Sequence, residues 1–240
     1  MKYGIIGYGR FGKLWADVLS SYGDVLIYDK NQTEKNTSLA KAIKTDLLFL
    51  LVPISEMENC CREIAPLLGP KTIVIDACSV KVHPVKVMRK WLPKNQPIIA
   101  THPLFGPDSV ARLGLKNQRI VVSPVRAGAA ERKKFEKILK KLELKIIHAT
   151  PEEHDRQMAS SQALVHFLGR GLAEMRLTKQ KISTPDFQSL LKINDLVGND
   201  TWQLFMDMQR FNPFAGEVRK NLVEALRGIE ENIGRVTCNL

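Results

Sequence analysis

The sequence TIVIDACSVK at residues 72–81, followed by PIIATHPLFGPDS at residues 97–109, contains two short apolar runs with polar residues after each. Such runs are typical of buried parallel strands, because both faces of the sheet are then covered. Ser79 and Lys81 follow the first run, and His102 follows the second. Ligands bind open α/β sheets outside the carboxyl ends of the strands, so we expect a hydroxyl, an ammonium and an imidazole to converge there.

His102 is the most informative of these residues because Pro103 follows it. A residue before proline is held in an extended conformation, which fixes the direction of the ring at the strand end. Imidazole titrates near neutrality and can accept a proton from a substrate hydroxyl. A structural histidine bonded to nearby backbone is the alternative interpretation. Taken alone, Ser79 also fits a turn or a helix cap, and Lys81 fits a solvated surface charge.

Residues 2–12, KYGIIGYGRFG, read as a strand, a glycine turn and the start of a helix. This is the context that the dinucleotide-binding fingerprint requires. The first glycine permits the tight turn, the second lets the backbone approach a pyrophosphate, and the third lets helix pack on strand, while the helix N-terminus favours the anion. The predicted cofactor-binding residues of this loop are Gly7, Gly9, Arg10, Phe11 and Gly12.

A second strand, residues 25–28, ends in Asp29, about 20 residues beyond the first glycines. A carboxylate here can accept hydrogen bonds from both ribose hydroxyls and would repel a 2′-phosphate, which favours NAD. Lys30 and Arg10 leave NADP open, and Asp29 alone also fits a turn. Val52 and Pro53 end the next apolar strand. We expect them to form an apolar surface against the nicotinamide, and the alternative is that they only terminate the strand.

Strands and helices alternate along residues 1–149, which predicts a doubly wound, parallel Rossmann-type sheet that binds the dinucleotide. Residues 150–240 contain only helix signals, beginning with a capping box at 150–153. We expect this second part to be a helical substrate and dimerisation domain. Gln162 and His166 lie one turn apart in an apolar helix, where they either line a pocket or form a satisfied buried pair. A long apolar stripe on the last helix favours packing on another helix, within the chain or across a homodimer.

Composition points to an ordinary globular protein. The 240 residues are 44% hydrophobic and 25% charged, and no apolar run approaches the length of a membrane span. The N-terminus shows no basic region with a cleavage site, so we expect a cytoplasmic protein with no membrane partner. The four cysteines lack metal-binding spacing, and we predict no metal site.

Much of the net charge of +11 lies in helix-like segments such as residues 131–145, where lysines fill one face of the predicted helix. No nucleic-acid motif accompanies them, so we expect a small anionic substrate rather than nucleic acid.

Four blocks occur in order along the chain: GYGRFG, VIDACSVK, THPLFGPDS and EEHDRQMASSQALVHF. Together they resemble the prephenate/arogenate dehydrogenase family of tyrosine biosynthesis. The resemblance implies NAD-dependent oxidative decarboxylation of prephenate or arogenate, with hydride leaving ring C4 for the nicotinamide. His102 would then bind and deprotonate the C4 hydroxyl, and Ser79 would hold His102 and touch the nicotinamide. Lys81, Gln162 and His166 match positions near the substrate.

One feature of the family has no clear counterpart in the sequence. The family commonly supplies an arginine from the helical domain for a substrate carboxylate, and only Lys192 and Arg210 are candidates here. The choice between prephenate and arogenate therefore stays open. Two other functions fit the sequence less well: a different nicotinamide-dependent oxidoreductase acting on a hydroxy acid or imine, and a nucleotide-sensing regulator.

Overall fold

The structure of the chain, a computed structural model, describes residues 1–31 and 34–237. It divides into two compact units, Met1–His154 and Asp155–Leu240. The division expected from the sequence, between residues 149 and 150, lies just before helix α7 (Pro151–Met158). The two units are described separately.

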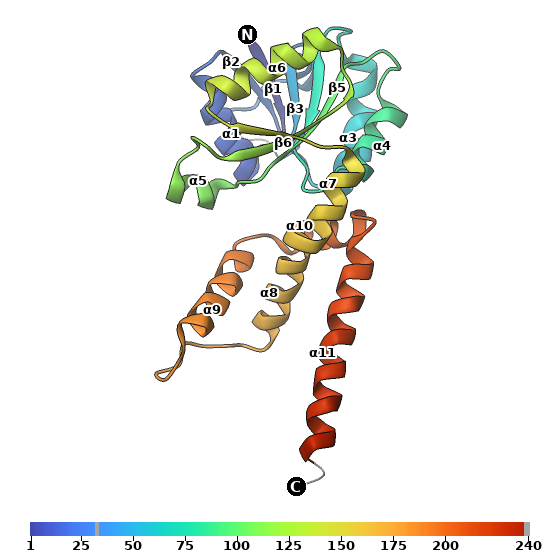
Figure 1. Ribbon diagram of the computed structural model, residues 1–240. Coiled ribbons are helices and arrows are strands. Elements are labelled where there is room, and N and C mark those ends of the chain that lie inside the picture. The colour runs from blue at the N-terminus through green and yellow to red at the C-terminus, as the bar shows by residue number, and fades with distance from the viewer. Residues whose placement is uncertain (32–33, 238–240) are drawn as a thin grey trace. The chain divides into compact units, whose positions relative to one another are not determined.

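The first unit contains a seven-stranded sheet and the helices that connect its strands (Figure 1). The strands are β1 (Lys2–Ile6), β2 (Asp24–Tyr28), β3 (Leu47–Leu50), β4 (Ile73–Asp76), β5 (Ile98–Pro103), β6 (Arg119–Arg126) and β7 (Lys145–His148). The helices are α1 (Arg10–Ser20), α2 (Leu39–Ile43), α3 (Met57–Ile64), α4 (Val82–Trp91), α5 (Pro107–Leu113) and α6 (Ala129–Lys141), with 3-10 turns η1 (Ile54–Glu56) and η2 (Ala65–Leu67).

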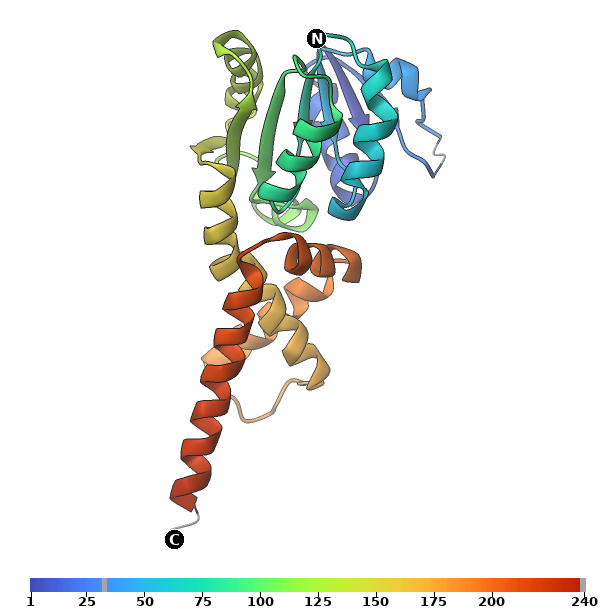
Figure 2. The same ribbon diagram turned by 90° about the vertical axis from the view of Figure 1, so that its right-hand side faces the viewer.

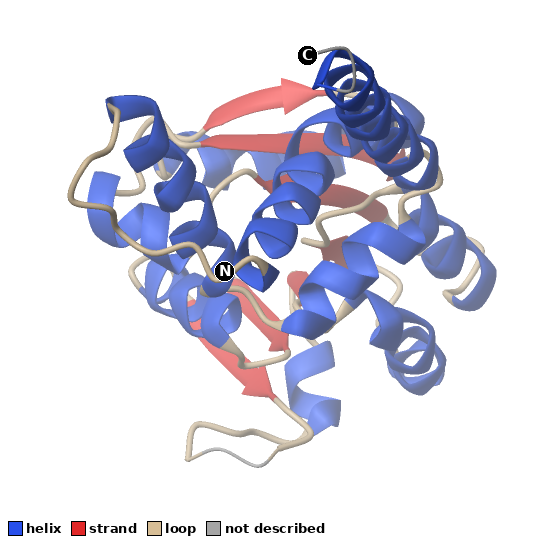
Figure 3. Ribbon diagram, turned by 90° about the horizontal axis from the view of Figure 1, so that it is seen from below, coloured by secondary structure: helices blue, strands red, loops and turns tan. Residues whose placement is uncertain are grey.

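All the strands belong to one sheet, with the spatial order β2-β1-β3-β4-β5-β6-β7. Figure 3 shows strands of this sheet in red, partly covered by helices in blue. The chain runs outward from β1 to β2 and then returns to place β3 on the other side of β1. The strand order therefore changes direction between β1 and β3, and this is where open α/β sheets bind their ligands. The predicted fold class, a Rossmann-type sheet followed by a helical part, is confirmed.

One strand departs from the predicted parallel arrangement. The first five strands in sequence are parallel, whereas β6 pairs with β5 in the antiparallel sense, and β7 is parallel to β6. The connection between β5 and β6 holds only the short helix α5 and makes no crossover over the sheet. A parallel pair requires such a crossover, so the chain returns antiparallel.

Alternate residues of the strands are buried on opposite faces of the sheet. One face packs on α1 and α6 through a cluster that includes Trp15, Leu19 and Phe135. Helices α3 and α4 pack together, and Figure 2 shows them in front of the sheet with α1 behind it. Strands β3, β4 and β5 are buried along their whole length. Their near-continuous apolar sequences follow from burial on both faces.

The second unit is built only from helices among its described residues. It contains the end of α7, a π-helical turn η3 (Ala159–Ala163), and helices α8 (Leu164–Glu174), α9 (Pro185–Gly198), α10 (Trp202–Phe211) and α11 (Ala215–Thr237). The predicted cap of α7 forms, because the backbone N–H of Glu153 donates to Thr150 Oγ1 at 3.1 Å. The π turn interrupts the single continuous helix that the sequence pattern predicts for this region.

Several large apolar side chains of this unit are exposed. Trp202 has the helical spacing of a core residue but is 57% exposed, and it packs its ring against Phe205 at 5.0 Å between centroids. The apolar stripe of α11 is largely exposed beyond its first turns: Leu226, Ile229 and Ile233 are 54–58% exposed.

Candidate active site

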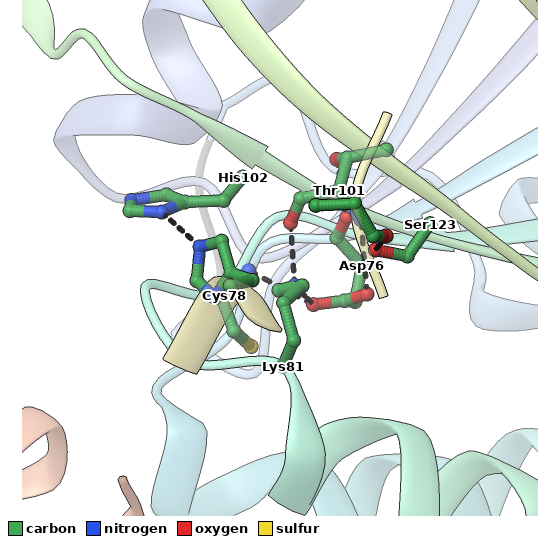
Figure 4. Close-up of polar contacts among 8 residues, drawn as sticks. Asp76, Cys78, Lys81, Thr101, His102 and Ser123 are labelled. Atoms are coloured by element: carbon green, nitrogen blue, oxygen red, sulfur yellow. Dashed lines mark hydrogen bonds and ion pairs between the residues drawn. The ribbon is translucent and has the colours of Figure 1, made fainter. Parts of the chain in front are cut away.

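The ends of β4 and β5 bring Asp76 and His102 to one edge of the sheet (Figure 4). His102 is 3% exposed. Figure 4 shows one ring nitrogen of His102 joined to a second imidazole, while the rest of the ring points away from Asp76 and Lys81. The extended conformation that Pro103 imposes on residue 102 fits its position in β5.

Lys81 lies below His102 in a fully buried ion pair. Its Nζ donates to Asp76 Oδ2 and to the carbonyl oxygen of Thr101, and neither side chain of the pair is exposed. The Oγ1 of Thr101 donates to the carbonyl oxygen of Asp76 at 2.6 Å. These bonds tie the end of β4 to β5 directly beside His102. The contact between Lys81 and substrate stays a prediction, while the observed contacts give the ammonium a structural role.

His154, from α7, is the direct hydrogen-bond partner of His102. Nδ1 of His102 lies 2.8 Å from Nε2 of His154, and both residues are buried. Burial lowers the pKa of His102 well below its usual value, and the nearby charges of His154 and Lys81 lower it further. His102 is therefore a neutral imidazole near pH 7, the state in which it can accept a proton.

Ser79 was expected to hold His102, and in the structure His154 takes that place. Ser79 is half-buried, and the described residues show no hydrogen bond to its hydroxyl. The neighbouring Cys78 is buried, and burial raises the pKa of its thiol well above the usual value. Cys78 is thus a neutral thiol that fills space rather than a nucleophile.

The glycine loop between β1 and α1 has the conformation that the fingerprint requires. Gly7 has φ +100°, and a Cβ there would lie 2.4 Å from the carbonyl oxygen of Leu51. A Cβ on Gly12 would lie 2.2 Å from the oxygen of Gly7, so glycine allows α1 to pack closely on the loop. A Cβ on Gly9 would meet no atom within 4 Å. The backbone at Gly9 is therefore open to a ligand.

Asp29 holds this loop from the end of β2. Its Oδ2 accepts a hydrogen bond from the backbone N–H of Tyr8, and its Oδ1 accepts one from Asn31 at 2.8 Å. Each carboxylate oxygen has a second lone pair, so these bonds leave acceptor capacity for ribose hydroxyls. Arg10, at the start of α1, pairs with Asp108 of α5 at 2.6 Å.

The remaining predicted cofactor residues lie around the same edge. Phe11 is half-buried and packs its ring on Trp15 and Phe105, with centroids 5.7 and 6.3 Å apart. Val52 is half-buried and Pro53 exposed just beyond β3.

The observed residues fit a dinucleotide. Helix α1 begins at Gly9 without a side-chain cap and without an acidic residue in its first turn, so its first N–H groups have no anionic side chain of their own. These groups attract a pyrophosphate at a helix N-terminus. The open backbone at Gly9 and the carboxylate of Asp29 complete the arrangement that binds a nicotinamide dinucleotide.

In the helical unit, three buried polar atoms have no hydrogen-bond partner among the described residues. They are Oε1 of Gln162, Nδ1 of His166 and Nε of Arg170, spaced one helical turn apart. His166 Nε2 lies 3.7 Å from Asp200 Oδ2, and Arg170 donates to the backbone oxygen of Asp200. Burial lowers the pKa of His166, Asp200 raises it, and Arg170 lowers it. Gln162 and His166 are therefore not a mutually satisfied buried pair.

Helix α6 is one of the basic segments of the protein, with lysines and an arginine along its exposed face. A groove of about 740 Å³ runs along this helix and the exposed strand β7. Its lining residues are Ala129, Arg132, Lys133, Glu136, Lys137, Lys140, Lys141 and His148.

Membrane-spanning helices and metal-binding clusters are both absent from the described residues. Residues 1–31 and 34–237 contain no helix that is both long and apolar enough to cross a membrane. The same residues contain no cluster of three or more His, Cys, Asp or Glu side chains placed to hold a metal ion.

Comparison with known proteins identifies the family. A family model described as "Prephenate dehydrogenase, nucleotide-binding domain" matches residues 28–148, half of the chain. The chain belongs to the prephenate dehydrogenase family. A second family model, "TYRAAT1-like, C-terminal domain", matches residues 171–236. The resemblance drawn from the four sequence blocks is thereby confirmed.

Two curated relatives of the prephenate dehydrogenase family illustrate the match. Arogenate dehydrogenase 1 of Arabidopsis thaliana is 29% identical over 235 residues, which cover 90% of this chain and 37% of that protein. Prephenate dehydrogenase [NADP(+)] of Saccharomyces cerevisiae is 28% identical over 188 residues, covering 71% of this chain and 41% of that one. The chain thus spans about two fifths of the length of these relatives.

A solved prephenate dehydrogenase shares the fold. The Aquifex aeolicus enzyme, in complex with hydroxyphenyl propionate and NAD+, superposes with a TM-score of 0.78 at 17% identity. The superposition covers 98% of this chain and 91% of that one.

Sequence reasoning missed two residues, His154 in the first unit and Arg170 in the helical unit. His154 had been read as part of a helix start, although its position one turn into a capped helix placed it on the buried side. Arg170 had no signal of its own, but the four-residue spacing from Gln162 and His166 would have placed it on the same face.

Proposed function

We propose that this protein catalyses the oxidative decarboxylation of prephenate or arogenate with a nicotinamide dinucleotide. The observation that carries the proposal is the buried, neutral imidazole of His102 at the end of β5, at the same edge of the sheet as the glycine loop that follows β1. The protein's membership of the prephenate dehydrogenase family and its similarity to an arogenate dehydrogenase support the same reaction.

The bound dinucleotide supplies an acceptor for the hydride that leaves ring C4. His102 accepts the proton of the C4 hydroxyl as the hydride departs. The C–O single bond thereby gains the double-bond character of a carbonyl. The ring carboxylate then leaves as carbon dioxide, and its bonding electrons make the ring aromatic. His102 returns the proton to the oxygen of the new phenol. Aromatisation makes the reaction strongly favourable in free energy. The protein therefore has mainly to align ring C4 of the substrate with the nicotinamide and to accept and return one proton.

Arg170 is the residue that we assign to a substrate carboxylate. The described residues give its half-buried guanidinium no carboxylate partner: it donates to the backbone oxygen of Asp200, and its buried Nε has no hydrogen-bond partner. An anionic ligand would complete these hydrogen bonds. Gln162 and His166 remain our candidates for polar contacts to the same ligand.

NAD is the cofactor that we propose, because Asp29 places a carboxylate at the end of β2, where a 2′-phosphate would be repelled. Arg10 and Lys30 keep NADP as an alternative, and the yeast relative carries NADP(+) in its name. Arg10 is paired with Asp108, and Lys30 lies 3.7 Å from Glu56. These pairs partly neutralise the cations that an extra phosphate would need.

We also propose a homodimer formed through the helical unit. Leu226, Ile229 and Ile233 are exposed on α11 at spacings of three and four residues, the pattern of a helix–helix seam.

The decisive experiment is a turnover assay with purified protein. Prephenate and arogenate are each mixed with NAD and with NADP, and the absorbance of the reduced cofactor is followed. We expect turnover with one substrate in the presence of NAD. His102→Asn should lower kcat by about 10²- to 10⁴-fold while cofactor binding is retained. Folded wild-type protein that turns over neither substrate would refute the proposal.

A further inference from the structure

The side chain of His102 is hydrogen-bonded to another histidine. Nδ1 of His102 and Nε2 of His154 are 2.8 Å apart, and the ring centroids lie 5.0 Å apart at 75°. His102 is on β5 and His154 on α7, and the two residues are 3% and 2% exposed. A nitrogen–nitrogen distance of this size requires one proton between the rings, because two lone pairs or two N–H groups would repel.

The direction of this hydrogen bond decides what His102 can do. A neutral imidazole carries one proton, on either Nδ1 or Nε2. If His102 donates from Nδ1, its Nε2 keeps a lone pair and can accept a proton. If His102 instead accepts on Nδ1, its Nε2 carries hydrogen and cannot act as a base.

We propose that His154 is a positioning residue that holds His102 in the Nδ1–H tautomer, with Nε2 of His154 as acceptor. The partner of one ring nitrogen sets the protonation of the other, so His154 leaves the Nε2 lone pair of His102 for the substrate hydroxyl. This proposal deepens and rests on the proposed dehydrogenase function. Neither the sequence blocks nor the comparisons assign such a role to His154.

The charged groups around His102 make this support necessary. Lys81 precedes α4 and lowers the pKa of His102, although Asp76 of β4 pairs with its ammonium. When His102 takes the hydroxyl proton, a second positive charge appears in this buried place. A charge-assisted hydrogen bond from Nδ1–H to His154 stabilises that imidazolium until the proton returns to the phenol oxygen.

Each bond of the step is accounted for. The O–H bond of the substrate breaks and an N–H bond forms at Nε2 of His102. The C4 hydrogen would leave with the electron pair of its bond, and a bound nicotinamide would supply the two-electron acceptor for this hydride. The bond from the ring to its carboxylate breaks, and its electron pair completes the aromatic ring. His154 exchanges no proton with the substrate.

Two substitutions at position 154 separate positioning from packing. His154→Gln keeps an amide oxygen that can accept from Nδ1, whereas His154→Leu fills space without an acceptor. His148→Gln is the matched control, because His148 is an exposed histidine of β7 paired with Glu136 at 3.5 Å. Urea unfolding of each variant establishes that it is folded before its kinetics are compared with those of the wild type.

Kinetics give the first readout. We expect His154→Leu to lower kcat about 100-fold with little change in KM, and His154→Gln to recover most of the loss. In His154→Leu the acid limb of kcat/KM should move to lower pH, because the acceptor that stabilises protonated His102 is lost, and His154→Gln should restore it. A packing role alone would leave that limb in place. Equal kcat in His154→Leu and wild type would overturn the proposal.

The second readout does not need activity. Long-range proton–nitrogen NMR spectra of histidine-labelled protein distinguish the two tautomers, and His102→Asn assigns the signal. We expect the Nδ1–H form in wild type and a mixture in His154→Leu. An Nε2–H form in wild type would contradict the proposal even if neither substrate is turned over, whereas absent turnover alone contradicts only the proposed function.

Discussion

Lys81 and Asp76 form an ion pair in which neither side chain is exposed to solvent. The pair lies between β4 and β5, and the ammonium also bonds to the carbonyl oxygen of Thr101, the residue before His102. Its contacts make the pair part of the frame that holds the imidazole.

Removing one member of this pair should destabilise the protein strongly. Lys81→Met leaves the Asp76 carboxylate buried without its cation, which should lower the free energy of unfolding by about 3–5 kcal/mol. The double variant Lys81→Met/Asp76→Asn should recover part of the loss. Urea unfolding measures both. Lys90→Met, which breaks an exposed pair with Glu58, is the control and should change stability by less than about 1 kcal/mol. A small effect of Lys81→Met would contradict the structural role.

The pH dependence of activity should reflect the lowered pKa of His102. A base works only while it is neutral, and burial lowers the pKa of His102 below the ordinary value of 6.5. We therefore expect kcat/KM to persist through pH 6.5 and to fall only at more acidic pH. The measurement is a pH profile at saturating cofactor. Half-loss of activity at or above pH 6.5 would show that the base is not this buried imidazole.

Arg170 should govern the affinity for substrate. Arg170→Met removes the guanidinium that we assign to a carboxylate, and KM should rise roughly 10- to 100-fold with a smaller change in kcat. Arg170→Lys should be intermediate, because an ammonium lacks the planar fork of donors. Arg210→Lys and Lys192→Met, at the exposed positions that the sequence alone suggested, serve as controls. If KM changed as much in the two control variants as in Arg170→Met, the assignment of Arg170 to a substrate carboxylate would be wrong.

Asp29 should set the preference for NAD. Asp29→Asn removes the charge that repels a 2′-phosphate but keeps an oxygen to accept from the N–H of Tyr8. The ratio of kcat/KM for NAD to that for NADP should fall about tenfold or more. Steady-state assays with both cofactors test this. Asp24→Asn, at the exposed start of the same strand, should leave the ratio unchanged.

The exposed stripe of α11 should be the dimer contact. Leu226→Glu with Ile229→Glu places two charges in the proposed seam, so sedimentation velocity should show a monomer where the wild type sediments as a dimer. Glu231→Lys changes the charge of the same helix away from the stripe and should leave the dimer intact. A wild-type monomer would refute the proposed interface.

Local sequence patterns were enough to predict the Rossmann-type sheet, the glycine loop and the strand ends that carry Asp76 and His102. Those features depend on short-range rules: apolar runs form buried strands, glycine permits the tight turn at Gly7, and proline holds its neighbour extended. The same rules missed the antiparallel β6, because strand direction depends on how the chain returns over the sheet. Helical spacing alone would also place the exposed Trp202 in the core, since periodicity does not show which face of a helix is covered.

The sequence by itself determined the type of fold and most of the chemical groups that the site uses. Only the tertiary structure decided their partners. It paired Lys81 with Asp76 inside the protein, set His154 against His102 across 52 residues, and left the buried Nε of Arg170 without a hydrogen-bond partner among the described residues. The physical reason is that hydrogen bonds and ion pairs depend on distances between side chains far apart in sequence, whereas propensity and periodicity report only on neighbours along the chain.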